Sequence, residues 1–239
     1  MKILVSAFSN LYTDQRIEKV CDTLHRNGYK IQLIGNTWGG EPDMERPYPF
    51  FRIRHSQTSL RRAYLEFQFK LYRELTKRAD KNTILLANDL DALLPNFLIA
   101  KKLNIPLVFD SHEIFTEMPA IKGRFTQKIW KSLEKQLVPG TKYMMTESHS
   151  YAEWFHDEYG VQPVVIRNIP KKITETIDIP ENNPKIILYQ GAINQSRGIP
   201  QAILAMKNIE NAVFKIIGDG PKKEEYEALA RKENLEEKV

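Results

Sequence analysis

Residues 3–8 read Ile-Leu-Val-Ser-Ala-Phe, a short and mostly apolar run that is typical of a buried strand. After a polar loop, apolar residues recur at the spacing i, i+3, i+4, i+7, which predicts a helix with one apolar face. The residues at these positions are Ile17, Val20, Cys21 and Leu24. Asn27-Gly28 ends that helix, and residues 31–34 form the next strand. A strand, a helix and a second strand in this order predict two parallel strands joined by a right-handed crossover.

The same alternation continues to residue 166. Further strands are predicted over residues 50–53, 83–87, 106–109, 142–146 and 163–166. Further helices are predicted over residues 60–78, 91–103, 127–137 and 150–159. The pattern Ser150-x-x-Glu153 is a capping box that would begin the last of these helices. Strands that alternate with helices throughout place the chain in the α/β class and predict a doubly wound, parallel-sheet, Rossmann-like domain.

The composition changes over residues 169–184, which contain three prolines and the pair Asn182-Asn183, as is typical of a linker. The alternation then restarts, with strands predicted over 185–189 and 213–217 and helices over 200–206 and 221–237. We therefore expect an N-terminal domain over residues 1–168 and an incomplete, second Rossmann-like domain over residues 185–239. So small a sheet cannot bury its faces alone. Either it packs on the first domain or more chain follows it, and we expect the chain to be truncated.

The bulk composition is that of an ordinary globular protein, with 239 residues of which 42% are hydrophobic and 27% charged. Cys21 is the only cysteine, which excludes an internal disulfide and favours the cytoplasm. No run of about 18 apolar residues occurs, so no transmembrane helix is expected. The net charge of +5 suits phosphate-bearing ligands or an anionic membrane surface. Without a nucleic-acid-binding motif, no nucleic-acid partner is expected.

The residues that follow the predicted strands are the candidates for function, because ligands of parallel sheets bind outside the carboxyl ends of the strands. His112 is the main candidate catalytic residue, since an imidazole can donate to a sugar hydroxyl and can carry charge near neutral pH. Asp110 and Glu113 flank His112 and would orient its ring. The alternative is a surface loop whose Asp and Ser cap a helix.

Asp89-Leu90-Asp91 has the D-x-D pattern, in which two carboxylates can share a divalent cation. Asp91 is better explained as the N-cap of the helix that follows, so no metal is expected, although Asp89 would still face the cleft. Asp14 suits a cap or first-turn position. Arg16 is unfavourable near a helix N-terminus, so it would serve a ligand anion unless it is simply solvated. Asp14, Arg16, Asp89, Asp110 and Glu113 are therefore the candidate substrate-binding residues.

Two glycine-containing loops of the second domain are candidates for binding phosphate. Residues 191–198 read Gly-Ala-Ile-Asn-Gln-Ser-Arg-Gly and lie between a predicted strand and helix, where backbone N–H groups can approach a phosphate. Arg197 adds a planar cation suited to a diphosphate. A further strand ends at Gly218-Asp219-Gly220. The candidate phosphate-binding residues are thus Gly191, Arg197, Gly198, Gly218 and Gly220. The alternative is a pair of ordinary tight turns.

Residues 60–73 interleave aromatic and basic side chains. Such a helix could contact a membrane surface or a lipid-linked acceptor. A helix packed on the core would explain the aromatic residues equally.

Taken together, four segments in this order resemble bacterial family 4 (group 1) glycosyltransferases, which have the GT-B fold. They are Asn88-Asp89-Leu90-Asp91-Ala92-Leu93, Val108-Phe109-Asp110-Ser111-His112-Glu113, the basic aromatic helix ending near Glu134, and residues 160–168. Residues 188–198 and 218–221 are similar to the start of the family's donor-binding domain. The resemblance implies two Rossmann-like domains around a cleft, retention of anomeric configuration, no metal or other cofactor, and contact of His112 with the donor sugar.

The resemblance also has departures. The family often places an Arg and a Lys five residues apart on the donor diphosphate, and here the two positions are Ala192 and Arg197. The glycine-rich first loop of the family is replaced by residues 10–14. The family's Glu-x7-Glu element would lie beyond Val239, so the resemblance implies that this chain alone transfers little or no sugar.

The function we expect is retaining transfer of a sugar from a nucleotide-sugar donor to a glycan or lipid-linked acceptor, in the synthesis of surface polysaccharide. The expected location is the cytoplasm, with peripheral contact at the inner face of the cell membrane left open. Two alternatives remain: a sugar-nucleotide epimerase of the same fold, and a non-catalytic half-enzyme that serves as a partner subunit.

Overall fold

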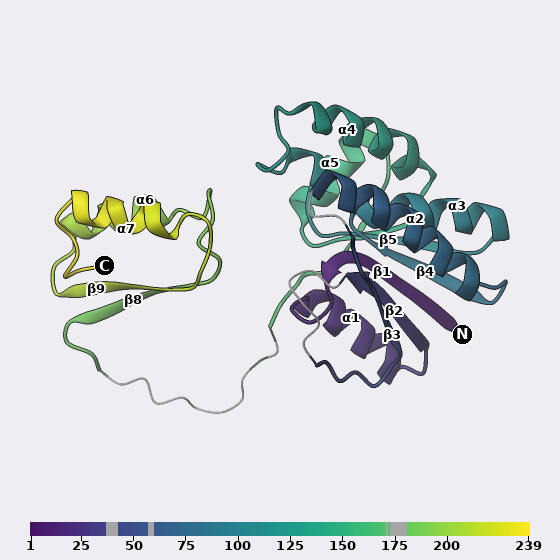
Figure 1. Ribbon diagram of the computed structural model, residues 1–239, viewed down its shortest axis with the longest axis horizontal. Helices are drawn as coiled ribbons and strands as arrows, with labels where there is room; N and C mark the ends of the chain where they lie inside the picture. The colour runs from purple at the N-terminus through teal and green to yellow at the C-terminus, as the bar shows by residue number, and fades with distance from the viewer. Residues whose placement is uncertain (37–42, 57–59, 171, 173–180) are drawn as a thin grey trace. The chain divides into compact units, whose positions relative to one another are not determined.

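The computed structural model describes residues 1–36, 43–56, 60–170, 172 and 181–239. The chain forms two compact units, unit 1 over Met1–Pro170 and unit 2 over Lys171–Val239 (Figure 1). Within the described residues, no helix is long and apolar enough to cross a membrane.

Unit 1 is built on a parallel sheet whose described strands lie in the order β3-β2-β1-β4-β5-β6-β7. The strands are β1 (Lys2–Asn10), β2 (Lys30–Asn36), β3 (Phe50–Ile53), β4 (Thr83–Asn88), β5 (Leu107–Ser111), β6 (Tyr143–Thr146) and β7 (Val164–Val165). Strands β2 and β3 are added to one side of β1, and strands β4 to β7 are added to its other side. The point at which the order of addition reverses, the switch point, therefore lies between β1 and β4. This is the doubly wound, Rossmann-like α/β fold that the sequence predicts, and ligands of such sheets bind at the switch point.

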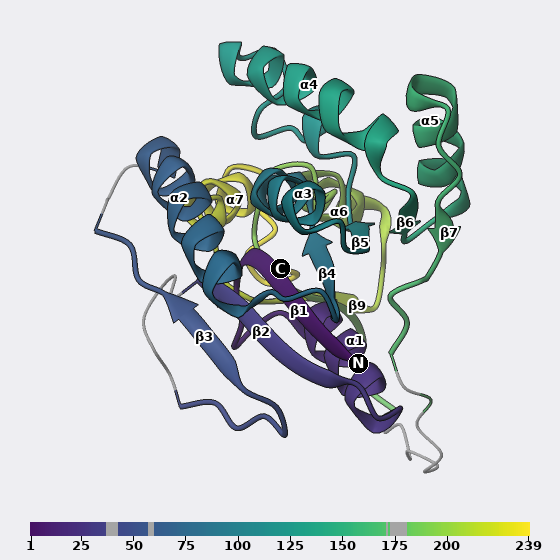
Figure 2. The ribbon, with the colours of Figure 1, turned by 90° about the vertical axis from the view of Figure 1, so that its right-hand side faces the viewer.

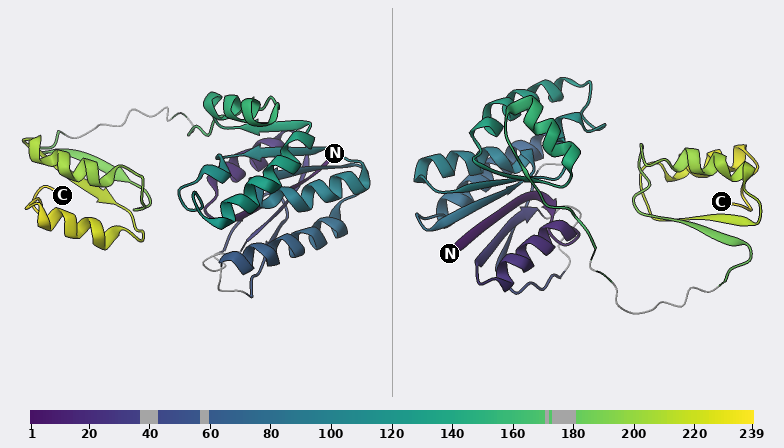
Figure 3. Two further views of the ribbon diagram at one scale, coloured as in Figure 1. Left: turned by 90° about the horizontal axis from the view of Figure 1, so that it is seen from above. Right: turned by 180° about the vertical axis from the view of Figure 1, so that it is seen from behind.

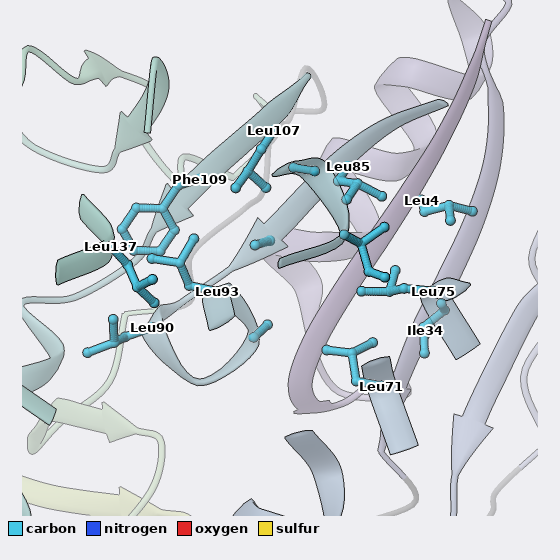
Figure 4. Packing of buried hydrophobic residues seen from close by; sticks show 14 of the residues in the cluster. Leu4, Ile34, Leu71, Leu75, Leu85, Leu90, Leu93, Leu107, Phe109 and Leu137 are labelled. Atoms are coloured by element: carbon cyan, nitrogen blue, oxygen red, sulfur yellow. The ribbon is translucent and has the colours of Figure 1, made fainter. Parts of the chain in front are cut away.

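Helices cover both faces of this sheet (Figure 2). They are α1 (Gln15–Arg26), α2 (Leu60–Arg78), α3 (Leu90–Leu103), α4 (Phe125–Leu137) and α5 (His149–Tyr159), with the short 3-10 helices η1 (Phe115–Glu117) and η2 (Val138–Gly140). Because alternate strand residues point to opposite faces, Leu4 packs with α2 and α3 in the larger core (Figure 4). Its neighbours Ile3 and Val5 pack with Ile17 and Cys21 of α1 on the other face.

Unit 2 contains two described parallel strands, β8 (Lys185–Gln190) and β9 (Ala212–Ile217), with helices α6 (Ile199–Ala205), η3 (Met206–Asn208) and α7 (Lys223–Lys232) (Figure 3). Ile203, Phe214 and Tyr226 form the centre of its core. Ile186, Ile187 and Leu188 of β8 are exposed, whereas Ala212 and Phe214 of β9 are buried in this core.

Several predicted boundaries are wrong. The helix predicted from Ser150 begins at His149, and Ser148 is its N-cap, whose Oγ accepts from the N–H of Tyr151 at 3.2 Å. The predicted helix 221–237 is shorter, because α7 ends at Lys232 and Asn234 takes a left-handed conformation with φ +56°. The strand predicted to end at residue 109 continues to Ser111, since Asp110 and Ser111 pair with Met145 and Thr146 of β6.

Candidate functional site

The candidate site of unit 1 lies at the carboxyl ends of β4 and β5, beside the switch point of the sheet. Asp89 directly follows β4, and its N–H donates to the carbonyl of Asp110 at 2.9 Å. Asp110 is the next-to-last residue of β5, and His112 follows that strand. The side chains of Asp89, Asp110 and His112 therefore meet because two parallel strands end side by side.

Asp89 holds the residue that follows β5. Its Oδ1 accepts from the backbone N–H of His112 at 2.8 Å, and its Oδ2 lies 3.3 Å from His112 Nδ1. Asp89 adopts φ +60° and ψ +166°, a region that almost only glycine occupies. A conformation of this kind costs about 1–3 kcal/mol and is found mainly where function requires it. The strained backbone makes Asp89 a candidate functional residue.

Asp89, and not Asp91, occupies the N-cap position of α3, which corrects the N-cap prediction for Asp91. The carboxylate of Asp89 makes no cap hydrogen bond to α3, because it is turned toward His112. Burial raises the pKa of Asp89 to about 6, although the charge and the N–H of His112 oppose this rise.

The ring of His112 lies between two carboxylates. On the side away from Asp89, its Nε2 lies 3.3 Å from Oδ2 of Asp110. This pair is close in distance but poorly aligned, since Nε2 has no well-formed hydrogen bond to any residue that the structure describes. Burial lowers the pKa of His112, but Asp110 and Asp89 outweigh it and raise the pKa to about 8. His112 is therefore mostly protonated at neutral pH.

Arg16 fixes the position of Asp110. Its Nη2 lies 2.6 Å from Asp110 Oδ1, its Nε lies 3.3 Å from Asp110 Oδ2, and its Nη1 donates to the carbonyl of Ile166 at 3.0 Å. Both side chains are buried. Burial raises the pKa of Asp110, but His112 and Arg16 outweigh it and hold the pKa below its ordinary value. The alternative of a solvated Arg16 is therefore wrong, because its buried guanidinium binds Asp110 and the carbonyl of Ile166.

The remaining substrate-binding candidates are placed differently. Asp14 is the N-cap of α1, where its Oδ1 accepts from the N–H of Ile17 at 3.0 Å, so its predicted capping role is confirmed. Glu113 is exposed, and the Oγ of Ser111 donates to its backbone carbonyl at 2.8 Å. The sequence predicted that Glu113 would be the second carboxylate beside the His112 ring. In the structure that carboxylate belongs to Asp89. The binding roles of Asp14 and Glu113 stay predictions.

Asp91 is a buried acid that the sequence explained only as a cap. It is 7% exposed, and its Oδ1 has no hydrogen-bond donor among the described residues. Burial and the nearby charge of Asp89 raise its pKa well above the ordinary value. The described residues contain no group of three or more His, Cys, Asp or Glu side chains arranged to hold a metal ion.

The glycines of unit 2 permit a close approach of two loops. A Cβ on Gly218 would lie 1.9 Å from the carbonyl oxygen of Gly191, and a Cβ on Gly220 would lie 2.5 Å from that of Ile193. Gly198 is the N-cap of α6 with φ +74°. These glycines thus have reasons of packing and backbone conformation. Arg197 is exposed, and the phosphate-binding role predicted for these residues stays a prediction.

The sheet order and the strand-end site are those of a doubly wound, Rossmann-like domain. Residues 15–171 match the family model "Glycosyltransferase Family 4", and residues 172–239 match the model "Glycosyl transferases group 1". The chain belongs to glycosyltransferase family 4, which confirms the resemblance seen in the sequence. A search of curated proteins found no match.

Solved structures share this fold at low sequence identity. Sucrose-phosphate synthase from Thermosynechococcus elongatus aligns with 100% of this chain and 69% of its own, with a TM-score of 0.80 and 14% identity. WaaG, a glycosyltransferase involved in lipopolysaccharide biosynthesis, aligns over the same shares with a TM-score of 0.70 and 14% identity. Anabaena Alr3699/HepE, in complex with UDP and glucose, aligns with 100% of this chain and 68% of its own, with a TM-score of 0.64 and 15% identity.

Proposed function

We propose that this protein transfers a sugar, with retention of anomeric configuration, from a nucleotide-sugar donor to a glycan or lipid-linked acceptor in the synthesis of surface polysaccharide. The observation that carries the proposal is the His112 ring held between Asp89 and Asp110 at the switch point of the sheet. Family membership supports the reaction class. The UDP and glucose bound to Alr3699/HepE support a nucleoside diphosphate sugar as the donor.

In this reaction the bond between the anomeric carbon and the diphosphate oxygen breaks, and a new bond forms between that carbon and an acceptor hydroxyl oxygen. The diphosphate leaves with its electron pair from one face of the sugar. The acceptor hydroxyl attacks that same face, which retains the configuration, and its proton passes to the departing diphosphate oxygen. A protonated His112 places a positive charge beside the proposed sugar site, while its Nε2 is buried 3.3 Å from Oδ2 of Asp110. Asp89 and Asp110 keep the ring charged and oriented.

The candidate residues then divide into two groups. Asp110 and Arg16 are buried and act as positioning residues for the ring of His112. Asp89 is 28% exposed in its side chain and Glu113 is exposed, so these two can meet a substrate directly. For the diphosphate we propose Gly191, Arg197, Gly198, Gly218 and Gly220, and we propose no metal or other cofactor. The proposed compartment is the cytoplasm.

A screen of nucleotide sugars with the gene product tests the proposal, with hydrolysis and binding as readouts. We expect one donor class to bind and to be turned over, and His112→Ala to lower turnover by roughly 100-fold or more, as loss of a positioned acid or base does. His156→Ala is the matched control, because His156 is an exposed residue of α5. Equal turnover by His112→Ala and the wild-type protein would remove His112 from the mechanism.

A further inference from the structure

The outer side of α4 carries large apolar side chains in contact with solvent. Phe125 is 76% exposed and Ile129 is 55% exposed. The two residues are four positions apart, so they lie next to each other on one face of the helix. The opposite face is buried through Glu134 and Leu137, and the half-buried Trp130 packs on Phe115 with ring centroids 4.9 Å apart. Phe125 and Ile129 are therefore not required by the core.

The charge around these apolar residues is almost all positive. The segment from 122 to 136 contains five cations, all exposed, namely Lys122, Arg124, Lys128, Lys131 and Lys135. Its only acid is Glu134, which is buried and accepts hydrogen bonds from Thr116 at 2.9 Å and Tyr159 at 2.8 Å. Lys122 and Lys131 pair with Glu117. Within the described ranges, no ion pair is formed by Arg124, Lys128 or Lys135.

We infer that the α4 surface, made of Arg124, Phe125, Lys128, Ile129 and Lys135, binds the surface of an anionic lipid bilayer. A helix with Phe or Leu on one side and Lys or Arg beside it is typical of segments that lie in the membrane interface. The centre of a protein–protein interface is instead depleted in lysine. The positive charge matches anionic headgroups, while Phe125 and Ile129 can enter the boundary of the acyl chains.

The sequence pointed instead to residues 60–73, which lie in α2. This helix also exposes apolar side chains, because Leu65 is 73% and Phe69 is 63% exposed. Several of its cations are neutralised by carboxylates of the same helix: Lys70 pairs with Glu66, and Lys77 and Arg78 pair with Glu74. Arg124, Lys128 and Lys135 of the α4 surface, by contrast, form no ion pair with any described residue.

The core-facing side of α4 packs on the segment that follows the candidate site. Trp130 contacts Phe115 of η1, three residues after His112, and the ring centroids of Trp130 and Tyr64 are 5.6 Å apart. A bilayer on the outer side of α4 would present a lipid-linked acceptor near the ends of β4 and β5. This role in presenting an acceptor rests on the proposed function, whereas lipid binding by the α4 surface does not require sugar transfer.

Co-sedimentation with vesicles of phosphatidylcholine containing about one third phosphatidylglycerol, and with vesicles of phosphatidylcholine alone, tests this surface in the complete chain. We expect binding to the anionic vesicles only, and weaker binding in high salt. Phe125→Ser/Ile129→Ser should weaken binding at least tenfold. Lys128→Gln/Lys135→Gln should weaken it by more than tenfold, since each cation near an anionic bilayer contributes roughly fivefold.

The matched control is Leu98→Ser, which removes an exposed apolar residue from α3, the neighbouring helix. This variant should bind vesicles as the wild-type protein does. All changes are at exposed positions, so far-UV circular dichroism and melting temperature should stay unchanged and show that the variants fold. The proposal is overturned by lack of binding to anionic vesicles, by equal binding to both vesicle types, by undiminished binding of either double variant, or by an equal loss in Leu98→Ser. Co-sedimentation measures lipid binding and not sugar transfer. A negative result would therefore overturn the lipid-binding proposal alone, and the nucleotide-sugar screen would still test the proposed sugar transfer.

Discussion

The guanidinium of Arg16 lies 2.6 Å from the carboxylate of Asp110, a residue 94 positions further along the chain. The pair joins the start of α1 to the end of β5 and is buried on both sides. Since Asp110 in turn faces His112, the first helix of the chain determines how the catalytic candidate is oriented. A residue that the sequence suggested as a ligand-binding cation is thus part of the support of the site.

Arg16→Ala should destabilise unit 1 by about 3–5 kcal/mol, because removal of one member of a buried ion pair leaves the other charge uncompensated. The free energy of unfolding from urea titration measures this effect. Lys19→Ala is the matched control on the same helix, since the hydrogen bonds described for Lys19 are exposed, with Asn168 at 3.0 Å and with the carbonyl of Ile169 at 3.4 Å. It should change stability by less than about 1 kcal/mol. Similar losses in the two variants would contradict a special role for the Arg16–Asp110 pair.

Asp89→Asn should lower the pKa of His112 from about 8 toward its ordinary value, because a negative charge 3.3 Å from Nδ1 is removed. Asn has nearly the same shape as Asp and keeps an oxygen for the His112 N–H, so the fold should be retained. Titration of the His112 ring protons by NMR measures the shift. Glu113→Gln is the control, and it should leave the titration of His112 unchanged. An unaltered His112 pKa in Asp89→Asn would show that the two side chains do not interact in solution.

The sequence predicted the alternation of strands and helices in unit 1 and the doubly wound parallel sheet, because both follow from local patterns of apolar runs and helical spacing. It also predicted that His112 follows a strand end, and the role of His112 stays a prediction. The clamp between Asp89 and His112 was missed, since it depends on β4 and β5 ending at the same level, which is a matter of register. The Arg16–Asp110 pair was missed for the same reason, as it requires the three-dimensional position of α1. Ser150 was mistaken for a helix cap because Ser148, two residues earlier, has the same capping chemistry.

The stability of unit 1 should fall as the pH rises from about 6.5 to above 8. The folded state holds the proton of His112 with a pKa of about 8, compared with an ordinary value of 6.5. The stabilisation is therefore fully present below pH 6.5 and is lost as the pH passes through 8, with a size of about 2 kcal/mol. Free energies of unfolding of the wild-type protein and of His112→Gln, compared between pH 6 and pH 9, measure it. A difference between the two proteins that stays constant over this range would contradict the raised pKa.

Gly218→Ala should destabilise unit 2, because the new Cβ would lie 1.9 Å from the backbone oxygen of Gly191 and a backbone atom cannot move aside as a side chain does. The strain is expected to cost on the order of 1–3 kcal/mol. Hydrogen exchange of the amides of β8 and β9 measures it, since their protection should fall. Gly123→Ala is the control in unit 1, where a Cβ meets nothing within 4 Å and only the positive φ of +76° is unfavourable. It should leave exchange in β8 and β9 unchanged. Wild-type protection in Gly218→Ala would mean that the loops after β8 and β9 do not approach so closely, and that Gly218 is not required by their packing.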